Sequence, residues 1–240
     1  MSGDEVSMNV VLLLLCYAYV LFIIFVSGKM DKPLHLSRKS SRKFLHAMIG
    51  NLPFIIPFFT YNSFPLNFPF FVAAPFILVT FLACPYSPSK SFSMKMRGLS
   101  DITEEGHQLG LVFYAVSYTF LALCFSSKPY VIAAGILPMA YGDASASLVG
   151  EKYGKRKYRI FARKSLEGSA AMFLMSLLSF AASLVFFSAI YSFPVLDMLL
   201  GALGVAVVAT LAEGLSPLGF DNVTVPILSA MAFLALGGGF

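Results

Sequence analysis

The stretch YGDASASLVGEKYGKRKYRIFARKSLEG, from Tyr141 to Gly168, places an acid inside an apolar segment and follows it with the most basic run of the chain. Asp143 lies near the end of an apolar run that begins at about Tyr130, where a carboxylate is costly unless a cation, a partner or water compensates it. The cations that follow are Lys152, Lys155, Arg156, Lys157, Arg159, Arg163 and Lys164. One acid beside many cations suits a site where a metal ion and basic side chains share the charge of a polyphosphate.

The composition around this stretch is that of a membrane protein. The 240 residues are 58% hydrophobic and 12% charged, and the mean hydropathy is +0.80. These values lie outside the range of soluble domains. We therefore expect an all-α fold, a polytopic membrane helix bundle of about eight spans, with seven to nine as the range, in a single domain over residues 1–240.

Apolar runs of spanning length give the expected helices. Prolines inside some of the runs predict kinks or breaks, and Gly135 with Pro138 predicts the least regular helix. The amino terminus has neither the basic start of a signal peptide nor the arginines of a transit peptide, so the first run is expected to remain as a span. The runs are Met8–Ser27, Phe44–Thr60, Phe68–Cys84, His107–Phe125, Tyr130–Gly150, Ser169–Tyr191, Asp197–Leu215 and Asn222–Phe240.

The net charge of +5 is distributed unevenly along the chain. All cations except Lys128 lie in three clusters, at residues 29–43, 90–97 and 152–164. With eight spans, all three clusters fall on one side of the membrane, which the positive-inside rule identifies as the cytoplasmic side. We expect the N-terminus outside and the basic loops, with any site that they form, in the cytoplasm.

The basic run has two interpretations. The segment GEKYGK, Gly150 to Lys155, is one residue too short for a phosphate-binding P-loop and has Arg156 where Ser or Thr is required, which argues against a P-loop. A juxtamembrane loop attracted to anionic lipids accounts for any single lysine. The block as a whole predicts nucleotide or phosphate binding by Lys152, Lys155, Arg156 and Lys157, with Lys164 and Glu167 next to the following span.

Two further groups are candidate site residues. Arg42, Lys43 and His46 open the second run at helical spacing and predict a second phosphate contact; a positive-inside anchor is the alternative. Around the turn before the last run, Glu213, Asp221 and Asn222 supply oxygen ligands of the kind that Mg²⁺ accepts together with substrate phosphates. The alternative for Asp221 or Asn222 is to cap the last helix.

Four motifs in order resemble a family of integral-membrane lipid kinases that includes phytol kinase, dolichol kinase and CTP-dependent diacylglycerol kinase. They are RKFLHAMIGNLP (residues 42–53), YGDASASLVGEKYGKRK (141–157), RKSLEGSAAMF (163–173) and AEGLSPLGFDNVTVP (212–226). The middle two also resemble the phosphatidate cytidylyltransferases. The run Phe161-Ala162-Arg163-Lys164 departs from the Ser-Pro-Lys-Lys of those enzymes and favours the kinases.

The resemblance implies transfer of the γ-phosphoryl group of CTP, or another nucleoside triphosphate, to the hydroxyl of a membrane lipid. Asp143 would hold Mg²⁺, with Asp221, Asn222 or Glu213 contributing, and Lys164 would bind phosphate. The general base is Glu167 or Asp143. The expected partners are a polyprenol, phytol or diacylglycerol acceptor and the nucleotide, with no nucleic acid, and the oligomeric state is left open.

Two other classes of protein stay as alternatives. A cytidylyltransferase would use the same groups to attack the α-phosphate of CTP with a lipid phosphate. A transporter for an anionic solute would also place acids and glycine-broken helices at membrane depth. The sequence shows no internal repeat and gathers its polar groups on one side of the membrane, which argues against transport.

Overall fold

Helices dominate the computed structural model of the chain, which describes residues 3–27, 29, 38–84, 86–88, 109–217 and 219–239. The expected all-α bundle is confirmed. The longer helices are α1 (Gly3–Ser27), α2 (Arg38–Ile49), α3 (Phe68–Ala83), α6 (Gly110–Phe125), α7 (Pro129–Leu137), α8 (Asp143–Tyr153), α9 (Leu166–Tyr191), α10 (Leu199–Leu215) and α11 (Asp221–Ala235). The expected basic loop with Lys90, Lys95 and Arg97 lies outside the described residues.

Short turns and two hairpins complete the described chain. Two antiparallel hairpins pair β1 (Asn62–Ser63) with β2 (Leu66–Asn67) and β3 (Lys157–Arg159) with β4 (Arg163–Ser165). The second hairpin was not predicted, because it lies inside the run expected to be a basic loop. Single turns of 3₁₀ helix occupy Leu52–Phe54, Ile56–Phe58 and Val195–Met198.

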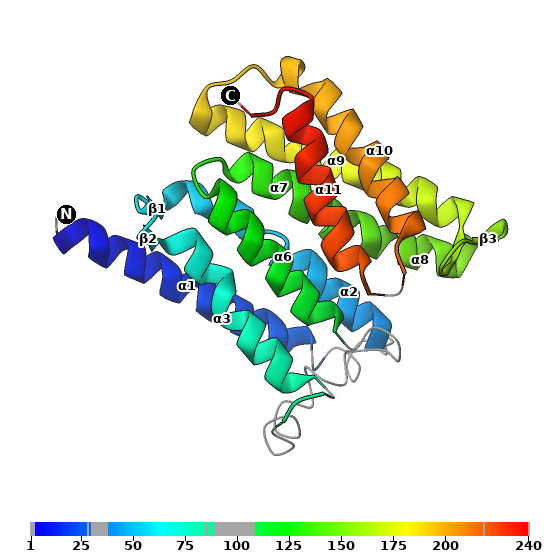
Figure 1. Cartoon of the computed structure of the whole chain (residues 1–240), viewed down its shortest axis with the longest axis horizontal. Coiled ribbons are helices and arrows are strands. Elements are labelled where there is room, and N and C mark those ends of the chain that lie inside the picture. The colour runs from blue at the N-terminus through cyan, green and yellow to red at the C-terminus, as the bar shows by residue number, and fades with distance from the viewer. Residues whose placement is uncertain are drawn as a thin grey trace.

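The helices cross the molecule roughly in one direction (Figure 1). The N-terminus lies at one end, and the start of α2, the β3–β4 hairpin and the α10–α11 turn lie at the other. Four helical segments are long and apolar enough to span a membrane: Asp4–Ser27, Pro129–Tyr153, Leu166–Tyr191 and Val195–Leu215. Three apolar helices, α3, α6 and α11, are shorter. The count of about eight spans therefore stays a prediction.

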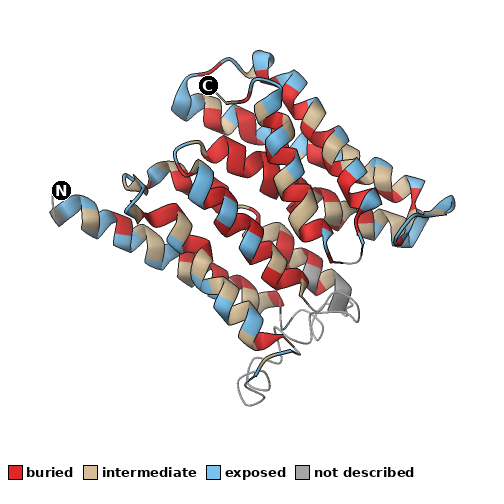
Figure 2. Ribbon diagram, in the orientation of Figure 1, coloured by how far each residue is buried: buried red, intermediate tan, exposed pale blue. Residues whose placement is uncertain are grey.

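The segment Pro129–Tyr153 is the central helix of the bundle. The most apolar stretch of this segment is 72% buried inside the protein, whereas that of Asp4–Ser27 is 22% buried. Figure 2 shows buried residues concentrated along the inner helices. The segment is not regular, because α7 and α8 are joined by a π turn at Pro138–Gly142. Turns of this kind accommodate an extra residue within a helix and are frequent at functional sites. The predicted irregularity at Pro138 is confirmed, and Asp143 follows it directly.

Helix α9 packs closely against this central segment. A Cβ on Gly142 would lie 2.4 Å from Ser176 Oγ, and one on Gly168 would lie 2.9 Å from the carbonyl oxygen of Ala146. The contact at Gly168 is with the backbone and requires glycine, whereas a larger residue at position 142 would displace the side chain of Ser176. The start of α9, which follows the basic hairpin, is thereby held beside α8.

Prolines have different effects in different segments. The run Phe44–Thr60, expected as one kinked span, is instead broken: α2 ends at Ile49, and 3₁₀ turns with Pro53 and Pro57 follow. The prediction of a continuous span was wrong there. By contrast, α3 continues through Pro75 and α11 through Pro226.

Side-chain hydroxyls explain why these two helices continue. A proline lacks the N–H that would bond to the carbonyl four residues earlier. For Pro75 that carbonyl belongs to Phe71, and the hydroxyl of Tyr17 on α1 donates to it at 2.7 Å. For Pro226 it belongs to Asn222, and the hydroxyl of Ser117 on α6 donates to it at 2.7 Å. Neighbouring helices thus satisfy the freed carbonyls, as membrane burial requires.

Removal of the Ser117 hydroxyl tests this role. We expect Ser117→Ala to lower the stability of the bundle by about 1–3 kcal/mol, because a buried carbonyl loses its donor. The measurement is the thermal unfolding midpoint in detergent. Ser188→Ala is the matched control, since that hydroxyl bonds to Val185 within its own helix. Equal midpoints for the two variants would show that Asn222 finds another donor.

Candidate functional site

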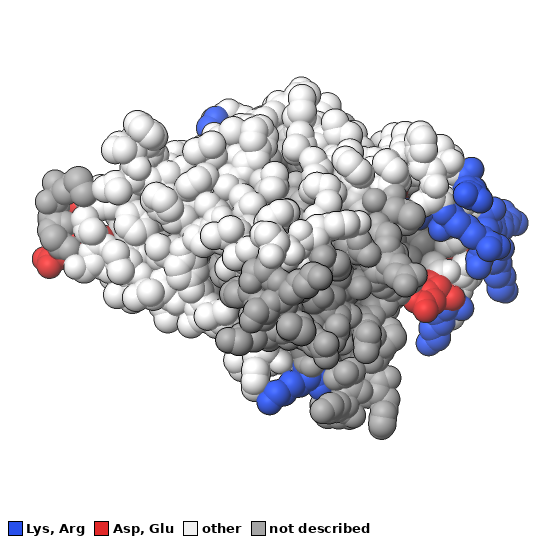
Figure 3. All heavy atoms as spheres, turned by 60° about the horizontal axis from the view of Figure 1, so that its bottom comes forward, with Lys and Arg blue, Asp and Glu red and all other residues white. Residues whose placement is uncertain are grey.

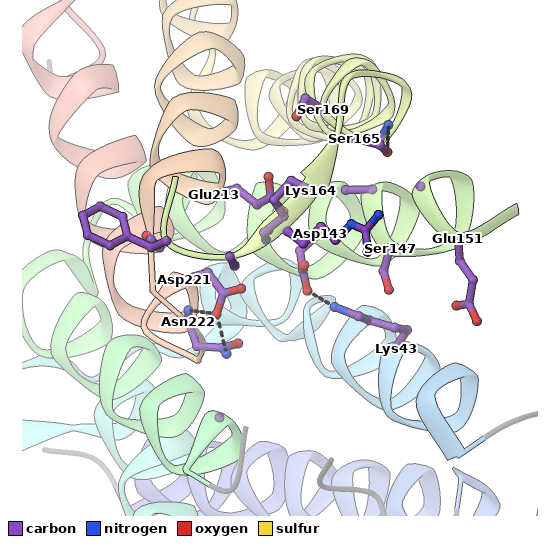
Figure 4. A pocket seen from close by; sticks show the side chains of 18 of the residues that line it. Lys43, Asp143, Ser147, Glu151, Lys164, Ser165, Ser169, Glu213, Asp221 and Asn222 are labelled. Atoms are coloured by element: carbon purple, nitrogen blue, oxygen red, sulfur yellow. Dashed lines mark hydrogen bonds and ion pairs between the residues drawn. The ribbon is translucent and has the colours of Figure 1, made fainter. Parts of the chain in front are cut away.

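A cavity of about 580 Å³ opens at the end of the bundle away from the N-terminus (Figure 4). Its lining comes from α2, α6, α8, the β3–β4 hairpin, α9, α10 and α11. These segments are distant in the sequence, so the cavity exists only in the folded chain. The predicted residues that line it are Lys43, His46, Asp143, Lys157, Lys164, Glu213, Asp221 and Asn222.

Asp143 and Lys43 form a buried ion pair across the cavity wall (Figure 4). Asp143 begins α8 immediately after the π turn, and Lys43 lies on α2. The two side chains are 13% and 8% exposed, respectively. Charges buried to this extent are stable only when they are paired. The pair therefore ties α2 to the central helix at the site.

Lys164 and Glu213 form a second ion pair, between β4 and the end of α10. The side chains are 21% and 4% exposed. Burial alone would lower the pKa of Lys164. The carboxylate of Glu213, with those of Asp221 and Asp143 further away, outweighs burial and raises the pKa above its ordinary value. Lys164 is thus a firmly charged ammonium group inside the cavity.

Asp221 and Asn222 line the cavity at the start of α11. The Oδ1 atom of Asp221 accepts hydrogen bonds from the backbone N–H of Asn222 at 3.0 Å and from its side-chain Nδ2 at 3.1 Å. The helix has Phe220 at its N-cap position and no capping side chain. The alternative role of Asp221 or Asn222 as a helix cap is therefore not seen.

Asp221 differs from Asp143 and Glu213 in its surroundings. In the part of the chain that the structure describes, no ion pair reaches it. Its residue is 8% exposed and lines the same cavity as Asp143. A carboxylate in this position is available to a bound cation.

The β3–β4 hairpin supplies a second set of cations. Lys157 lines the cavity together with Arg159 and Arg163, which face each other in the strand register. Figure 3 shows Lys and Arg side chains gathered at the end of the molecule that carries this hairpin. Of the four cations predicted to bind nucleotide in this run, Lys152, Lys155 and Arg156 do not line the cavity.

Hydrogen bonds fix the hairpin to α9. Ser165 accepts a bond from the backbone N–H of Gly168 at 3.1 Å and caps the helix. The hydroxyls of Tyr158 and Ser169 are 2.7 Å apart. The Glu167 carboxylate accepts from the backbone N–H of Arg156 at 3.2 Å and does not line the cavity. Its observed contact holds the hairpin.

Three more residues belong to the site or border it. His46 lines the cavity, and its ring lies 5.0 Å from that of Tyr114. Ser147 and Glu151, which were not predicted, follow Asp143 at four-residue intervals and line the cavity from the same face of α8. Their four-residue spacing from Asp143 is the feature of the sequence from which Ser147 and Glu151 could have been predicted. The side chain of Arg42 is outside what the structure describes.

The oxygen atoms present can take part in a magnesium site but do not form one alone. Among the described residues, no three His, Cys, Asp or Glu side chains converge as ligands. Mg²⁺ usually keeps several waters and takes one or two protein carboxylates together with substrate phosphates. Asp143 and Asp221 on one cavity satisfy that smaller requirement.

The chain is similar to known lipid kinases. A phytol kinase from Synechocystis sp. is 41% identical over 128 residues, which are 52% of this chain and 53% of the relative. Phytol kinase 1, chloroplastic, from Arabidopsis thaliana is 28% identical over 231 residues, 92% of this chain and 73% of the relative. CTP-dependent diacylglycerol kinase 1 from Eremothecium gossypii is 34% identical over 137 residues, which are 51% of this chain and 42% of the relative.

These similarities confirm the resemblance to membrane lipid kinases that the four motifs indicated. The chain spans about half the length of several of the curated relatives that it matches. No family model matches the chain. No solved structure matches it either.

The Lys164–Glu213 pair can be tested by titration. We expect Glu213→Gln to lower the pKa of Lys164, because burial then acts against a smaller opposing charge. The amine would lose its proton at lower pH and react with an acylating reagent there, and the modified peptide can be quantified by mass spectrometry. Asp197→Asn, at a residue outside the cavity lining, is the control. An unchanged reaction profile in Glu213→Gln would mean that Glu213 does not set the charge of Lys164.

Proposed function

We propose that this relative of the membrane lipid kinases transfers the γ-phosphoryl group of CTP to the hydroxyl of a membrane lipid, a phytol- or polyprenol-type alcohol or a diacylglycerol. One observation carries the proposal: acids and cations from the four resemblance motifs line one cavity. Phosphoryl transfer depends mainly on positioning and on neutralising charge. The cavity supplies both, because several cations line it together with the carboxylates of Asp143, Glu151, Glu213 and Asp221.

The cations divide into two groups in this mechanism. Lys164, held by Glu213, lines the cavity on the same hairpin as Lys157, Arg159 and Arg163, and together these cations would bind the phosphate oxygens. Lys43 holds Asp143 in place from α2. Asp143 and Asp221 would hold Mg²⁺ together with the substrate phosphates, and the ion would supply positive charge for the phosphoryl group during transfer.

The acceptor hydroxyl needs a base or a positioning group within hydrogen-bond reach. Asp143 is the better of the two predicted candidates, because it lines the cavity and Glu167 does not. The lipid would keep its chain in hydrocarbon and present its hydroxyl at the cavity. The nucleotide would enter from the side of the basic clusters, which we assign to the cytoplasm, with the N-terminus outside.

Labelled nucleotide distinguishes this reaction from cytidylyl transfer. Purified protein is incubated with CTP labelled at the γ- or the α-phosphate, with MgCl₂, and with phytol, geranylgeraniol, dolichol, diacylglycerol or phosphatidate. A kinase moves only the γ-label into an alcohol. Entry of α-label into phosphatidate would instead identify a cytidylyltransferase. Parallel reactions with ATP and UTP establish the donor, and reactions with EDTA test the metal.

Asp143→Asn tests the central acid. We expect the turnover number to fall by about 10³-fold, the scale on which loss of one preorganised electrostatic group acts. The assay measures transfer of the γ-label to the lipid alcohol at saturating CTP. The size-exclusion profile of the variant in detergent checks that it is folded. Asp197→Asn serves as the control carboxylate. A well-folded Asp143→Asn protein with near-normal turnover would remove Asp143 from the mechanism.

A further inference from the structure

The tip of the β3–β4 hairpin brings an aromatic ring to the polar cavity. Residues 160–162 form the loop between the two strands. Phe161 lines the cavity and is 63% exposed, whereas its neighbour Ile160 is 54% exposed and does not line it. Among the described residues that line the cavity, no other is Phe, Tyr or Trp. An uncovered ring thus borders a cavity that many charged side chains line.

Cations flank this ring on both strands. Arg159 and Arg163 are each two residues from Phe161 and face each other in the strand register, as Lys157 and Ser165 do. Residues paired in this way, and residues two apart along a strand, lie on the same face of a hairpin. All four line the cavity. One face of the hairpin therefore presents three cations to the cavity and carries a ring at its end.

Contacts with two helices hold the hairpin in place. The hydroxyls of Tyr158 and Ser169 on α9 are 2.7 Å apart. A Cβ on Gly214 of α10 would lie 3.0 Å from the same Tyr158 hydroxyl, so the tyrosine lies close to that helix. The backbone N–H of Leu166 donates to the carbonyl of Arg156 at 2.9 Å at the base of the hairpin. The ring at the tip is thus presented by an anchored element.

We propose that Phe161 is the stacking surface for the nucleobase of the phosphoryl donor, next to the hairpin cations that bind its phosphates. The inference rests on the proposed function, which makes a nucleoside triphosphate the ligand of the cavity. Such a ligand joins a flat aromatic base to a chain of anionic phosphates, and the hairpin offers an exposed ring beside cations. The cavity volume of about 580 Å³ is typical of sites for small organic ligands.

Neutral polar groups in the cavity are already engaged, which favours stacking as the contact with the base. The Nδ2 atom of Asn222 donates to the carbonyl of Gly219 at 3.3 Å and to Asp221 at 3.1 Å. The Ser169 hydroxyl is bonded to that of Tyr158. Stacking needs no such partner and is available to every base, because each base has an aromatic face. Loss of the ring should therefore weaken binding of CTP, UTP and ATP by comparable factors.

Removal of the ring tests the proposal. We expect Phe161→Ala to raise the KM for CTP about tenfold, the scale on which one base–aromatic stack acts, while turnover at saturating CTP stays within threefold. Phe161→Tyr keeps the ring and should keep the KM within twofold of wild type. Ile160→Ala is the matched control at the same tip. An unchanged KM in Phe161→Ala, or an equal rise in Ile160→Ala, would overturn the proposal.

A tryptophan in place of Phe161 reports stacking directly. The chain has no tryptophan, so Phe161→Trp carries a single one, whose emission a stacked base quenches. With MgCl₂ present, we expect saturable quenching by CTP, UTP and ATP, none by inorganic tripolyphosphate, and reversal of the CTP effect by excess tripolyphosphate. Ile160→Trp controls for light that the nucleotide absorbs. Equal quenching in the two variants, or no quenching of Phe161→Trp, would overturn the proposal.

A lipid surface is the alternative contact for the exposed ring, and the same variant tests it. In nanodiscs that contain brominated phosphatidylcholine, quenching of Phe161→Trp by the lipid without any effect of nucleotide would place the tip in the membrane and overturn the proposal. The inference and the proposed function also fail separately. Quenching by CTP without phosphate transfer keeps the stacking site and removes the proposed function. Phosphate transfer with equal KM values in wild type and Phe161→Ala keeps the function and removes the stacking site.

Discussion

Charge neutralisation inside an apolar bundle is the constraint on which the site depends. The ion pairs Lys43–Asp143 and Lys164–Glu213 bring together helices and a strand that are far apart in sequence. Removing one partner of a buried pair generally costs about 3–5 kcal/mol, because the other charge is left uncompensated. Each ion pair therefore stabilises the contact between two segments and also places charged groups in the cavity. Together the two pairs hold α2, α8, β4 and α10 around the cavity.

Hydrogen bonding of the backbone is the second constraint, and it explains the different effects of proline. Pro75 and Pro226 stay inside helices because Tyr17 and Ser117 reach the carbonyls that they leave without donors. The second of these bonds ends on Asn222, beside Asp221. The hydrogen bond from α6 thus keeps α11 helical through Pro226 and also positions the backbone of Asn222 at the edge of the cavity.

The sequence was sufficient to predict the class of fold and much of the site. Apolar runs located most helices, and an acid before a basic run located Asp143 and Lys164. Side-chain identity could not reveal the β3–β4 hairpin, because its strands are three residues long and consist largely of cations. As a result Lys152, Lys155 and Arg156 were chosen, whereas Arg159 and Arg163 line the cavity. The end of α2 at Ile49 could not be predicted from the sequence either. Pro53 and Pro75 both lie in apolar runs, and only the folded structure shows that a neighbouring helix supplies a hydrogen-bond donor near Pro75.

The π turn at Pro138–Gly142 has a consequence for how the central helix can change during evolution. A regular helix that loses one residue rotates everything beyond the gap by about 100°, since a turn holds about 3.6 residues. A π turn already carries one residue in excess of that repeat. Deletion within Met139–Tyr141 would restore regular winding and keep Asp143 pointing in its present direction. Length variation in this most buried segment is thus tolerable at that turn, directly next to the acid whose orientation matters most.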